Sequence, residues 1–293
     1  MLIKIYNFLI DELKKYNYIF FRKNNKRGLI MVDNFALIEE YMAKQQATWK
    51  EGDCYYVQLL RRQADDPMIG GVKDKKYHGN MHSRSIKDYL IKSVDNLEDV
   101  KEDIKAFCET FNVRAYIRLN KRNYKNIDLE MMKHIAEQCA SGETYSSPFH
   151  LVASACGECC QAGKDKTWIV DLDKEYLPYE NDVKEMILNC QPYVKRIQAY
   201  RDLGLSEEEA RNSVKSEFFV VPTKSGKHIV CKPFNKDSFT HAPSADEIAI
   251  AKEKGTEPRY GLWEKFCKSR GIELKCMDIH KDNPTILYVP DMQ

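Results

Sequence analysis

The first half of the chain alternates between segments with helical and strand-like spacing of apolar residues. Apolar positions that recur every three or four residues predict amphipathic helices. Stretches rich in strand formers, or with apolar and polar residues in strict alternation, predict strands. The predicted helices cover residues 35–46, 97–111, 127–138 and 181–200, and the predicted strands cover residues 53–60 and 113–119.

The second half of the chain is richer in strand patterns. Ser206 and Glu209 form a capping-box pattern that predicts the start of a helix. Strands interleaved with helices predict an α/β (α+β) fold with at least one mixed sheet. The predicted strands are 167–173, 217–222, 227–232, 273–279 and 285–289, and the helices are 206–215, 245–254 and 261–269.

The pattern also suggests how the chain is divided. Residues 1–33 are expected to form a helical extension, which is either appended or a mis-assigned start, because Met31 opens a sequence that could itself begin a protein. Residues 34–160 are expected to form an N-terminal α/β part, and residues 161–293 a strand-rich part. A glycine- and lysine-containing stretch over 65–83 predicts a mobile loop.

Composition narrows the functional classes. A net charge of +2 gives no global basic excess, so any nucleic-acid binding must come from a local patch. Ten cysteines without a secretory signal fit free thiols in a reducing cytoplasm. The apolar N-terminal run is too short to span a bilayer, so we expect a cytoplasmic protein without a membrane partner.

The strongest chemical signal is the sequence Trp168-Ile-Val-Asp171-Leu-Asp173. Residues at i and i+2 project from the same face of a strand, so both carboxylates point into one space. At roughly 4 Å, two such charges repel by about 4 kcal/mol at an effective dielectric near 20, which a divalent cation would remove. The alternative is a helix-capping aspartate beside a solvated one.

A second signal is a hairpin pattern over residues 218–232. His228 and Lys232 share one face of its second strand, beside a turn that contains Ser225, Gly226 and Lys227. An imidazole, ammonium groups and turn amides suit a polyphosphate. An ordinary hairpin with a solvated histidine is the alternative.

A third signal is an acid, Asp278, at the end of a strand, followed by a short turn with Lys281 and Asn283. If that strand neighbours residues 167–173, Asp278 adds a third carboxylate to the metal site. By itself this signal has little specificity.

In this order, the three signals resemble the motifs of the archaeo-eukaryotic primase (primase-polymerase) superfamily. Those motifs are a strand ending in Asp-x-Asp, a Ser-x-His-like motif, and a strand ending in an acid. The resemblance covers residues 50–290, and it is closest to the small versions from phages and mobile elements. One departure is that two residues, not one, separate Ser225 from His228.

The resemblance implies a catalytic core with a mixed, RRM-like sheet flanked by helices, in which both parts of the chain form one unit. It implies a DNA primase/polymerase-like nucleotidyltransferase of DNA replication, with two Mg²⁺ or Mn²⁺ ions held by Asp171, Asp173 and Asp278. Ser225, Gly226, Lys227, His228 and Lys232 would bind the nucleoside triphosphate. The partners would be single-stranded or primed DNA and a separate helicase.

Residues 114–122 form a basic stretch that could follow a template backbone and stack a base. A strand edge protected by charges is the alternative. The candidate nucleic-acid-binding residues are Arg114, Tyr116, Arg118, Arg122, Lys281 and Asn283.

Other readings stay open. The same aspartates could serve a metal-dependent nuclease or phosphodiesterase, or the domain could bind nucleotide or nucleic acid without catalysis. The CxxC pattern at Cys156, Cys159 and Cys160 has no second pair at suitable spacing, so we do not expect zinc.

Overall fold

The computed structural model describes residues 31–65, 83–142, 148–160, 166–273, 277–282 and 284–291. The predicted extension over residues 1–30 and most of the predicted loop over 65–83 lie outside the described residues. Contacts divide the chain into two units, which we describe separately. The first comprises Met1–Ile117, Arg122–Cys159 and Ile286–Gln293, and the second comprises Arg118–Lys121 and Cys160–Thr285.

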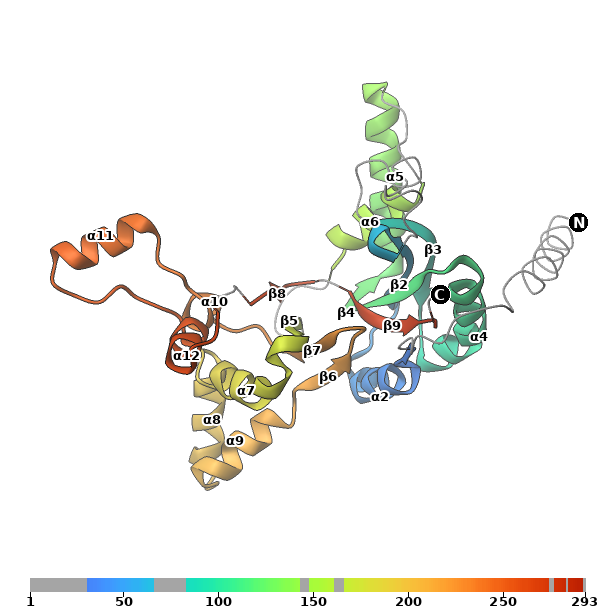
Figure 1. Ribbon diagram of the computed structural model, residues 1–293. Coiled ribbons are helices and arrows are strands. Elements are labelled where there is room, and N and C mark those ends of the chain that lie inside the picture. The colour runs from blue at the N-terminus through green and yellow to red at the C-terminus, as the bar shows by residue number, and fades with distance from the viewer. Residues whose placement is uncertain are drawn as a thin grey trace, which may run out of the picture. The chain divides into compact units, whose positions relative to one another are not determined.

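The first unit is built on a five-stranded sheet in the order β1-β9-β4-β2-β3. Figure 1 labels β2, β3, β4 and β9 of this sheet. Strand β2 pairs with β3 in an antiparallel hairpin from Tyr55↔Ile91 to Arg62↔Ser83, and β1 pairs antiparallel with β9. The strands are β1 (Val32–Asp33), β2 (Asp53–Arg62), β3 (Ser83–Ile91), β4 (Arg114–Asn123) and β9 (Thr285–Val289).

The described residues of this unit form four α-helices, and local capping explains where two of them start and end. Ser93 caps α4 by accepting the backbone N–H of Asn96, and Asn112 ends that helix in a left-handed conformation. Asn123 caps α5 in the same manner, and Gly142 ends it. The helices are α2 (Phe35–Gln45), α4 (Val94–Phe111), α5 (Tyr124–Ser141) and α6 (Pro148–Glu158).

The second unit has the chain order βαββαβ. Its four-stranded sheet runs β6-β7-β5-β8 with antiparallel neighbours throughout, which is the ferredoxin-like arrangement. The sheet predicted to be mixed is therefore antiparallel, because each pair of neighbouring strands runs in opposite directions. The strands are β5 (Trp168–Asp173), β6 (Phe219–Pro222), β7 (Gly226–Cys231) and β8 (Ile279–His280).

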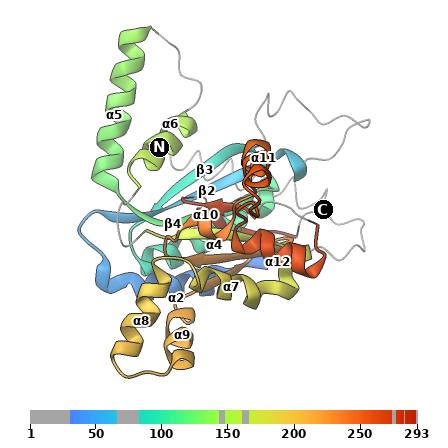
Figure 2. The same cartoon turned by 90° about the vertical axis from the view of Figure 1, so that its left-hand side faces the viewer.

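Helices pack on one face of this sheet and bury its apolar residues. Val170, Leu172, Ile229, Cys231 and Ile279 form one core with side chains from the helices. In Figure 2, α8 and α9 lie side by side, as their connection through a short turn requires. The helices that contribute to this core are α7 (Glu180–Leu188), α8 (Tyr193–Asp202), α9 (Glu207–Lys215), α10 (Lys236–Phe239) and α12 (Leu262–Arg270). The unit also contains α11 (Ala245–Glu253).

Most predicted elements are confirmed, including the capping box of Ser206 and Glu209 at the start of α9. The single helix predicted over 181–200 is wrong, because the segment forms α7 and α8 with a break between Leu188 and Tyr193. Pro192 lies in that break, where its missing N–H and fixed φ prevent a continuous helix. Strands β1 and β3 and helices α6 and α10 were not predicted. The strand predicted over 273–279 overlaps β8 at Ile279 alone among the described residues. Within the described ranges, no helix combines the length and apolarity needed to cross a bilayer.

Candidate metal and nucleotide site

Strand β5 presents its two aspartates on the sheet face opposite the helices. Val170 and Leu172 are fully buried in the core of the second unit. Because side chains alternate along a strand, Asp171 and Asp173 lie on the other face, as the sequence predicts. Asp171 is partly buried, whereas Asp173 at the strand end is exposed.

The register of β5 brings the three predicted motifs together around Asp171. On one side, Asp171 lies directly opposite His228 of β7, and the His228 Nε2 is 3.6 Å from the Asp171 Oδ1. On the other side, the Asp171 backbone N–H donates to the carbonyl oxygen of Asp278 at 2.9 Å. Asp171 and His228 are therefore neighbours on adjacent strands, with Asp278 beside Asp171. Asp278 directly precedes β8 and does not end a strand as predicted, because β8 begins at Ile279.

Burial sets the electrostatics of Asp171. Burial raises the pKa of the Asp171 carboxyl, His280 lowers it, and the neighbouring carboxylate of Asp278 raises it further. An ionised Asp171 is thus disfavoured by the protein around it. A bound cation would reverse that preference, so this carboxylate pair fits a divalent metal.

His228 is held as a neutral imidazole. Burial lowers its pKa to about 4, the positive field of His280 lowers it too, and Asp173 acts in the opposite direction. The His228 Nδ1 lies 2.8 Å from the hydroxyl oxygen of Thr285, a fully buried residue. That hydrogen bond fixes the ring, so that Nε2 faces Asp171. Near neutral pH the contact joins a carboxylate and a neutral ring and is not a salt bridge.

The three predicted metal ligands do not form a closed cage. Among the described residues, the one group of three His, Cys, Asp or Glu side chains whose ligand atoms all lie within 4.8 Å is Glu130, His134 and Glu158. Asp171, Asp173 and Asp278 do not meet that distance together. An ion on this face would bind to Asp171 with one neighbouring carboxylate, and substrate phosphate oxygens would complete its shell.

The hairpin turn supplies fewer phosphate donors than the sequence predicts. The Gly226 N–H donates to the Thr223 hydroxyl at 2.9 Å, so this amide is used inside the turn. Gly226 lies opposite Asp173, where an added Cβ would be 2.2 Å from the Leu172 carbonyl oxygen, so a larger residue would disrupt the pairing. Ser225 is exposed in the turn.

The two hairpin lysines lie in different places. Lys227 pairs with Leu172 in the sheet and forms an ion pair with Glu180 of α7 at 2.7 Å, on the helix-covered face. The structure therefore does not bring Lys227 to the side of His228. Lys232 follows β7 directly, and its backbone N–H donates to the Tyr193 hydroxyl at 2.7 Å. Its side chain is half-buried.

In the first unit, the candidate nucleic-acid-binding residues of β4 have internal roles. Arg114 forms an ion pair with Asp65. Tyr116 is buried in an apolar cluster, with the Arg62 guanidinium 5.9 Å from its ring centroid. Arg122 is 1% exposed and donates from Nε to the Cys156 carbonyl oxygen at 2.9 Å. Tyr116 and Arg122 lack the exposure that stacking a base or contacting a phosphate requires, so these predictions are corrected.

In the second unit, Arg118 binds the turn that follows β8. Its Nη1 lies 3.1 Å from the Asp282 carboxylate and 2.9 Å from the Asp282 carbonyl oxygen. The Asn120 side chain donates to the same carboxylate and accepts the backbone N–H of Thr167 at 2.7 Å. The Lys281 Nζ lies 5.8 Å from the Trp168 ring centroid. Asn283 lies outside the described residues.

Two residues of the site were missed from the sequence. His280 pairs with Ile169 and shares the face of Asp171, and Thr285 orients His228. His280 could have been found, because it follows Asp278 by two positions, the spacing that places side chains on one face of extended chain. Thr285 could not, because its partner lies 57 residues away.

No protein-family model matches the chain, and comparisons with the curated proteins and with the solved structures found no match.

Proposed function

We propose that this protein is a metal-dependent nucleotidyltransferase of the primase-polymerase type, with its site on the β5–β7–β8 face of the second unit. The observation that supports this is the register that makes Asp171, His228 and Asp278 neighbours on an antiparallel βαββαβ sheet. The three sequence motifs and their chain order carry the resemblance to that superfamily.

In the proposed reaction, the 3′-hydroxyl of a primer attacks the α-phosphorus of a nucleoside triphosphate. A new O–P bond forms, the bond to the leaving pyrophosphate breaks, and the hydroxyl proton passes to solvent. Mg²⁺ or Mn²⁺, when bound, would lower the pKa of that hydroxyl and offset charge on the pyrophosphate. Asp171 and Asp278, with Asp173 at the exposed strand end, would hold the ions.

His228 would position the phosphates in this proposal. A neutral imidazole can donate one hydrogen bond without adding charge, and burial keeps His228 neutral down to about pH 4. Lys232 would supply the positive charge, because Lys227 is paired with Glu180 on the opposite face. The partners are nucleoside triphosphates and primed or single-stranded DNA, with strands opened by a separate helicase.

A nuclease or phosphodiesterase is the second candidate, and the position of Lys227 favours it. Two lysines beside His228 would favour binding of a triphosphate. Of Lys227 and Lys232, only Lys232 can bind phosphate there, because Lys227 is paired with Glu180 on the opposite face. Carboxylates and a neutral histidine can also bind an ion that activates water for phosphodiester hydrolysis. Nucleotidyl transfer lengthens the primer strand, whereas hydrolysis shortens it.

The test is a primer assay. The purified protein is incubated with a primed single-stranded template, all nucleoside triphosphates and Mg²⁺ or Mn²⁺, beside an Asp171→Ala/Asp173→Ala variant. Extension that disappears in the variant supports nucleotidyl transfer. Metal-dependent shortening supports the nuclease. If the variant and the wild type behave alike, the proposed site is wrong.

A further inference from the structure

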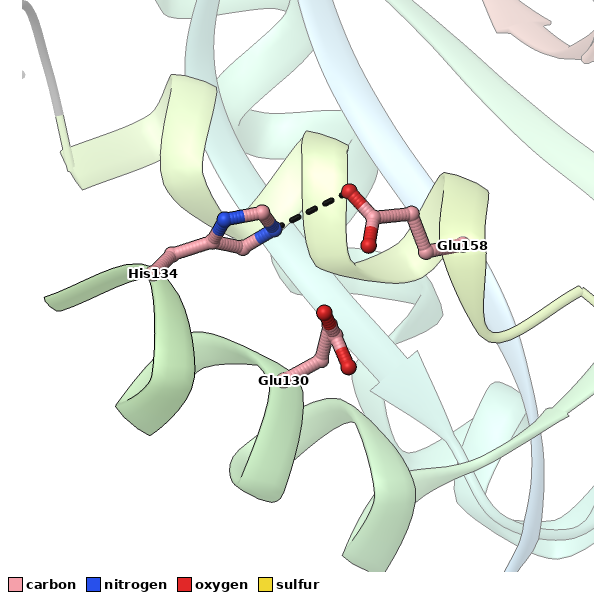
Figure 3. Close-up of side chains that lie close together, drawn as sticks. All are labelled: Glu130, His134 and Glu158. Atoms are coloured by element: carbon pink, nitrogen blue, oxygen red, sulfur yellow. Dashed lines mark hydrogen bonds and ion pairs between the residues drawn. The ribbon is translucent and has the colours of Figure 1, made fainter. Parts of the chain in front are cut away.

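A second group of metal-ligating side chains lies in the first unit, between helices α5 and α6 (Figure 3). Glu130 and His134 are four residues apart on α5, so they lie on the same side of that helix. Glu158 reaches toward them from the end of α6, and its Oε1 is 3.0 Å from the His134 Nε2. One ligand atom from each residue lies within 4.8 Å of the other two.

The donors in this group are of two kinds, which limits the ions that suit it. Imidazole nitrogen with carboxylate oxygen is a ligand set for Zn²⁺ and other transition ions. Mg²⁺ prefers oxygen ligands and keeps most of its water. The group therefore differs in chemistry from the aspartate-rich face of the second unit.

The side chains are accessible without being fully solvated. The exposed fraction is 22% for Glu130, 21% for His134 and 47% for Glu158, so an ion can enter and keep a water ligand. The charged neighbours are Lys133, which pairs with Glu130 at 2.6 Å, and Glu137, whose Oε2 is 3.7 Å from the His134 Nδ1. Lys133 is itself largely exposed and can turn to solvent when an ion binds Glu130.

We propose that Glu130, His134 and Glu158 bind a divalent transition ion of the Zn²⁺ type, which links α5 to α6. This site is independent of the proposed nucleotidyl transfer. A link would matter here because α5 gains little from the core: Ile127 is the one buried residue among its 18 residues. Side chains from two helices that share an ion cannot separate without losing a ligand.

Nearby thiols are a competing set of ligands that the test must separate. Cys159 lies close enough to Glu130 and Glu158 for both to raise the pKa of its thiol, after the larger effect of burial. Cys156 is buried in the apolar cluster under α5. A simple ion pair between a protonated His134 and Glu158 is the other alternative, and it needs no metal.

The test is a Co²⁺ titration followed by visible absorption, in the Asp171→Ala/Asp173→Ala background so that two of the carboxylates proposed to hold ions in the second unit are removed. We expect one equivalent of Co²⁺ to bind, with ligand-field bands and without the intense near-ultraviolet bands of thiolate ligation. His134→Ala and Glu158→Gln should each weaken binding at least about tenfold, since even partners of metal ligands cost that much. Asp128→Asn, which removes an exposed carboxylate of α5 outside the group, should bind as the parent does.

Limited proteolysis provides a second measurement that does not depend on a spectrum. Zn²⁺ should slow cleavage within the α5–α6 segment of the parent and leave the rate in His134→Ala unchanged. The proposal is overturned if the background protein binds no Co²⁺, if His134→Ala and Glu158→Gln bind it unchanged, or if thiolate bands show that the cysteines are the ligands. None of these outcomes bears on extension by the wild-type protein, so the two proposals can fail separately.

Discussion

Strands β4 and β5 carry similar sequence patterns but place their charged side chains in different surroundings. On β4, Arg114 pairs with Asp65, and Arg118 pairs with Asp282. On β5, burial and a second carboxylate raise the pKa of Asp171. Alternation along a strand predicts the face of each side chain in both cases, but only the partners distinguish a structural charge from a candidate site.

The charged side chains of β4 and β5 should contribute differently to the free energy of unfolding. A buried cation with a matched partner contributes to a single folded arrangement, and its removal leaves the partner unsatisfied. A buried carboxylate beside another carboxylate costs stability, and such costs are typical of functional sites. Substitutions on the two strands should therefore affect stability in opposite directions.

The largest expected effect is that of Asp171→Asn on activity. If the carboxylate holds the ion, its loss removes several kcal/mol of transition-state stabilisation, which is about 10³-fold in extension rate. Stability should rise, because a group with a raised pKa is disfavoured when ionised, and Asn carries no charge. The gain should be present at pH 7 and shrink as the pH falls toward 3.8. Primer extension and urea unfolding measure the two effects, and a loss of both activity and stability would contradict the comparison.

Arg122→Ala should be the most damaging change on β4. The side chain is buried, and its removal leaves a cavity and takes away the hydrogen bond that Arg122 donates to the Cys156 carbonyl oxygen. We expect a loss of about 3–5 kcal/mol in unfolding free energy. Lys44→Ala, at an exposed helical ion pair, is the control and should change it by less than about 0.5 kcal/mol. Equal effects would mean that Arg122 is not part of the core.

His228→Gln tests the electrostatics of the site through the pH dependence of stability, measured in metal-free buffer. The pKa of His228 is about 4 in the folded protein, below its ordinary value of 6.5. Between these values the unfolded chain binds a proton that the folded protein does not, so stability falls as the pH falls. From pH 6.5 to pH 5 the loss amounts to about 1.6 kcal/mol, less than the full 1.36 kcal/mol per unit because the unfolded histidine is only half protonated at pH 6.5. His228→Gln should lose this part of the pH dependence in urea unfolding, and an unchanged slope would show that His228 is not buried as a neutral ring.

Thr285→Val should have the smallest effect on stability and a clear one on activity. The substitution keeps the volume and removes the hydrogen-bond partner of the His228 Nδ1. We expect a loss of about 1 kcal/mol in unfolding free energy and of about tenfold or more in extension rate. Thr285→Ser, which keeps the hydroxyl, should retain most of the activity. A Val variant as active as the wild type would show that the ring needs no fixed orientation.

Local patterns predicted much of the fold. Alternation located β4 and strand-forming residues located β5 to β7, each within a few residues, and the capping box marked the start of α9. The break at Pro192 was visible in the sequence, but the apolar spacing on both sides favoured a single helix. Strand β3 was missed because its half-buried pattern is weak and it follows a glycine-rich stretch.

Local patterns also predicted part of the candidate site in the second unit. Strand spacing paired Asp171 with Asp173, but the partners that decide each role are distant in sequence. Arg118 meets Asp282 across 164 residues, and His228 meets Thr285 across 57. The metal-ligating group at Glu130 and Glu158 also depends on two helices coming together, which no local pattern indicates.

The most direct test of the central claim locates the bound ion on the chain. Fe²⁺ replaces Mg²⁺ in the presence of a nucleoside triphosphate, ascorbate and peroxide generate radicals at the ion, and mass spectrometry maps the cleaved backbone. If the ion binds on the β5–β7–β8 face, we expect cuts near Asp171, His228 and Asp278 that vanish in Asp171→Asn. The same cuts should persist in Asp246→Asn, which changes an exposed aspartate of the same unit. Cuts absent from those three segments, or unchanged in Asp171→Asn, would contradict the account.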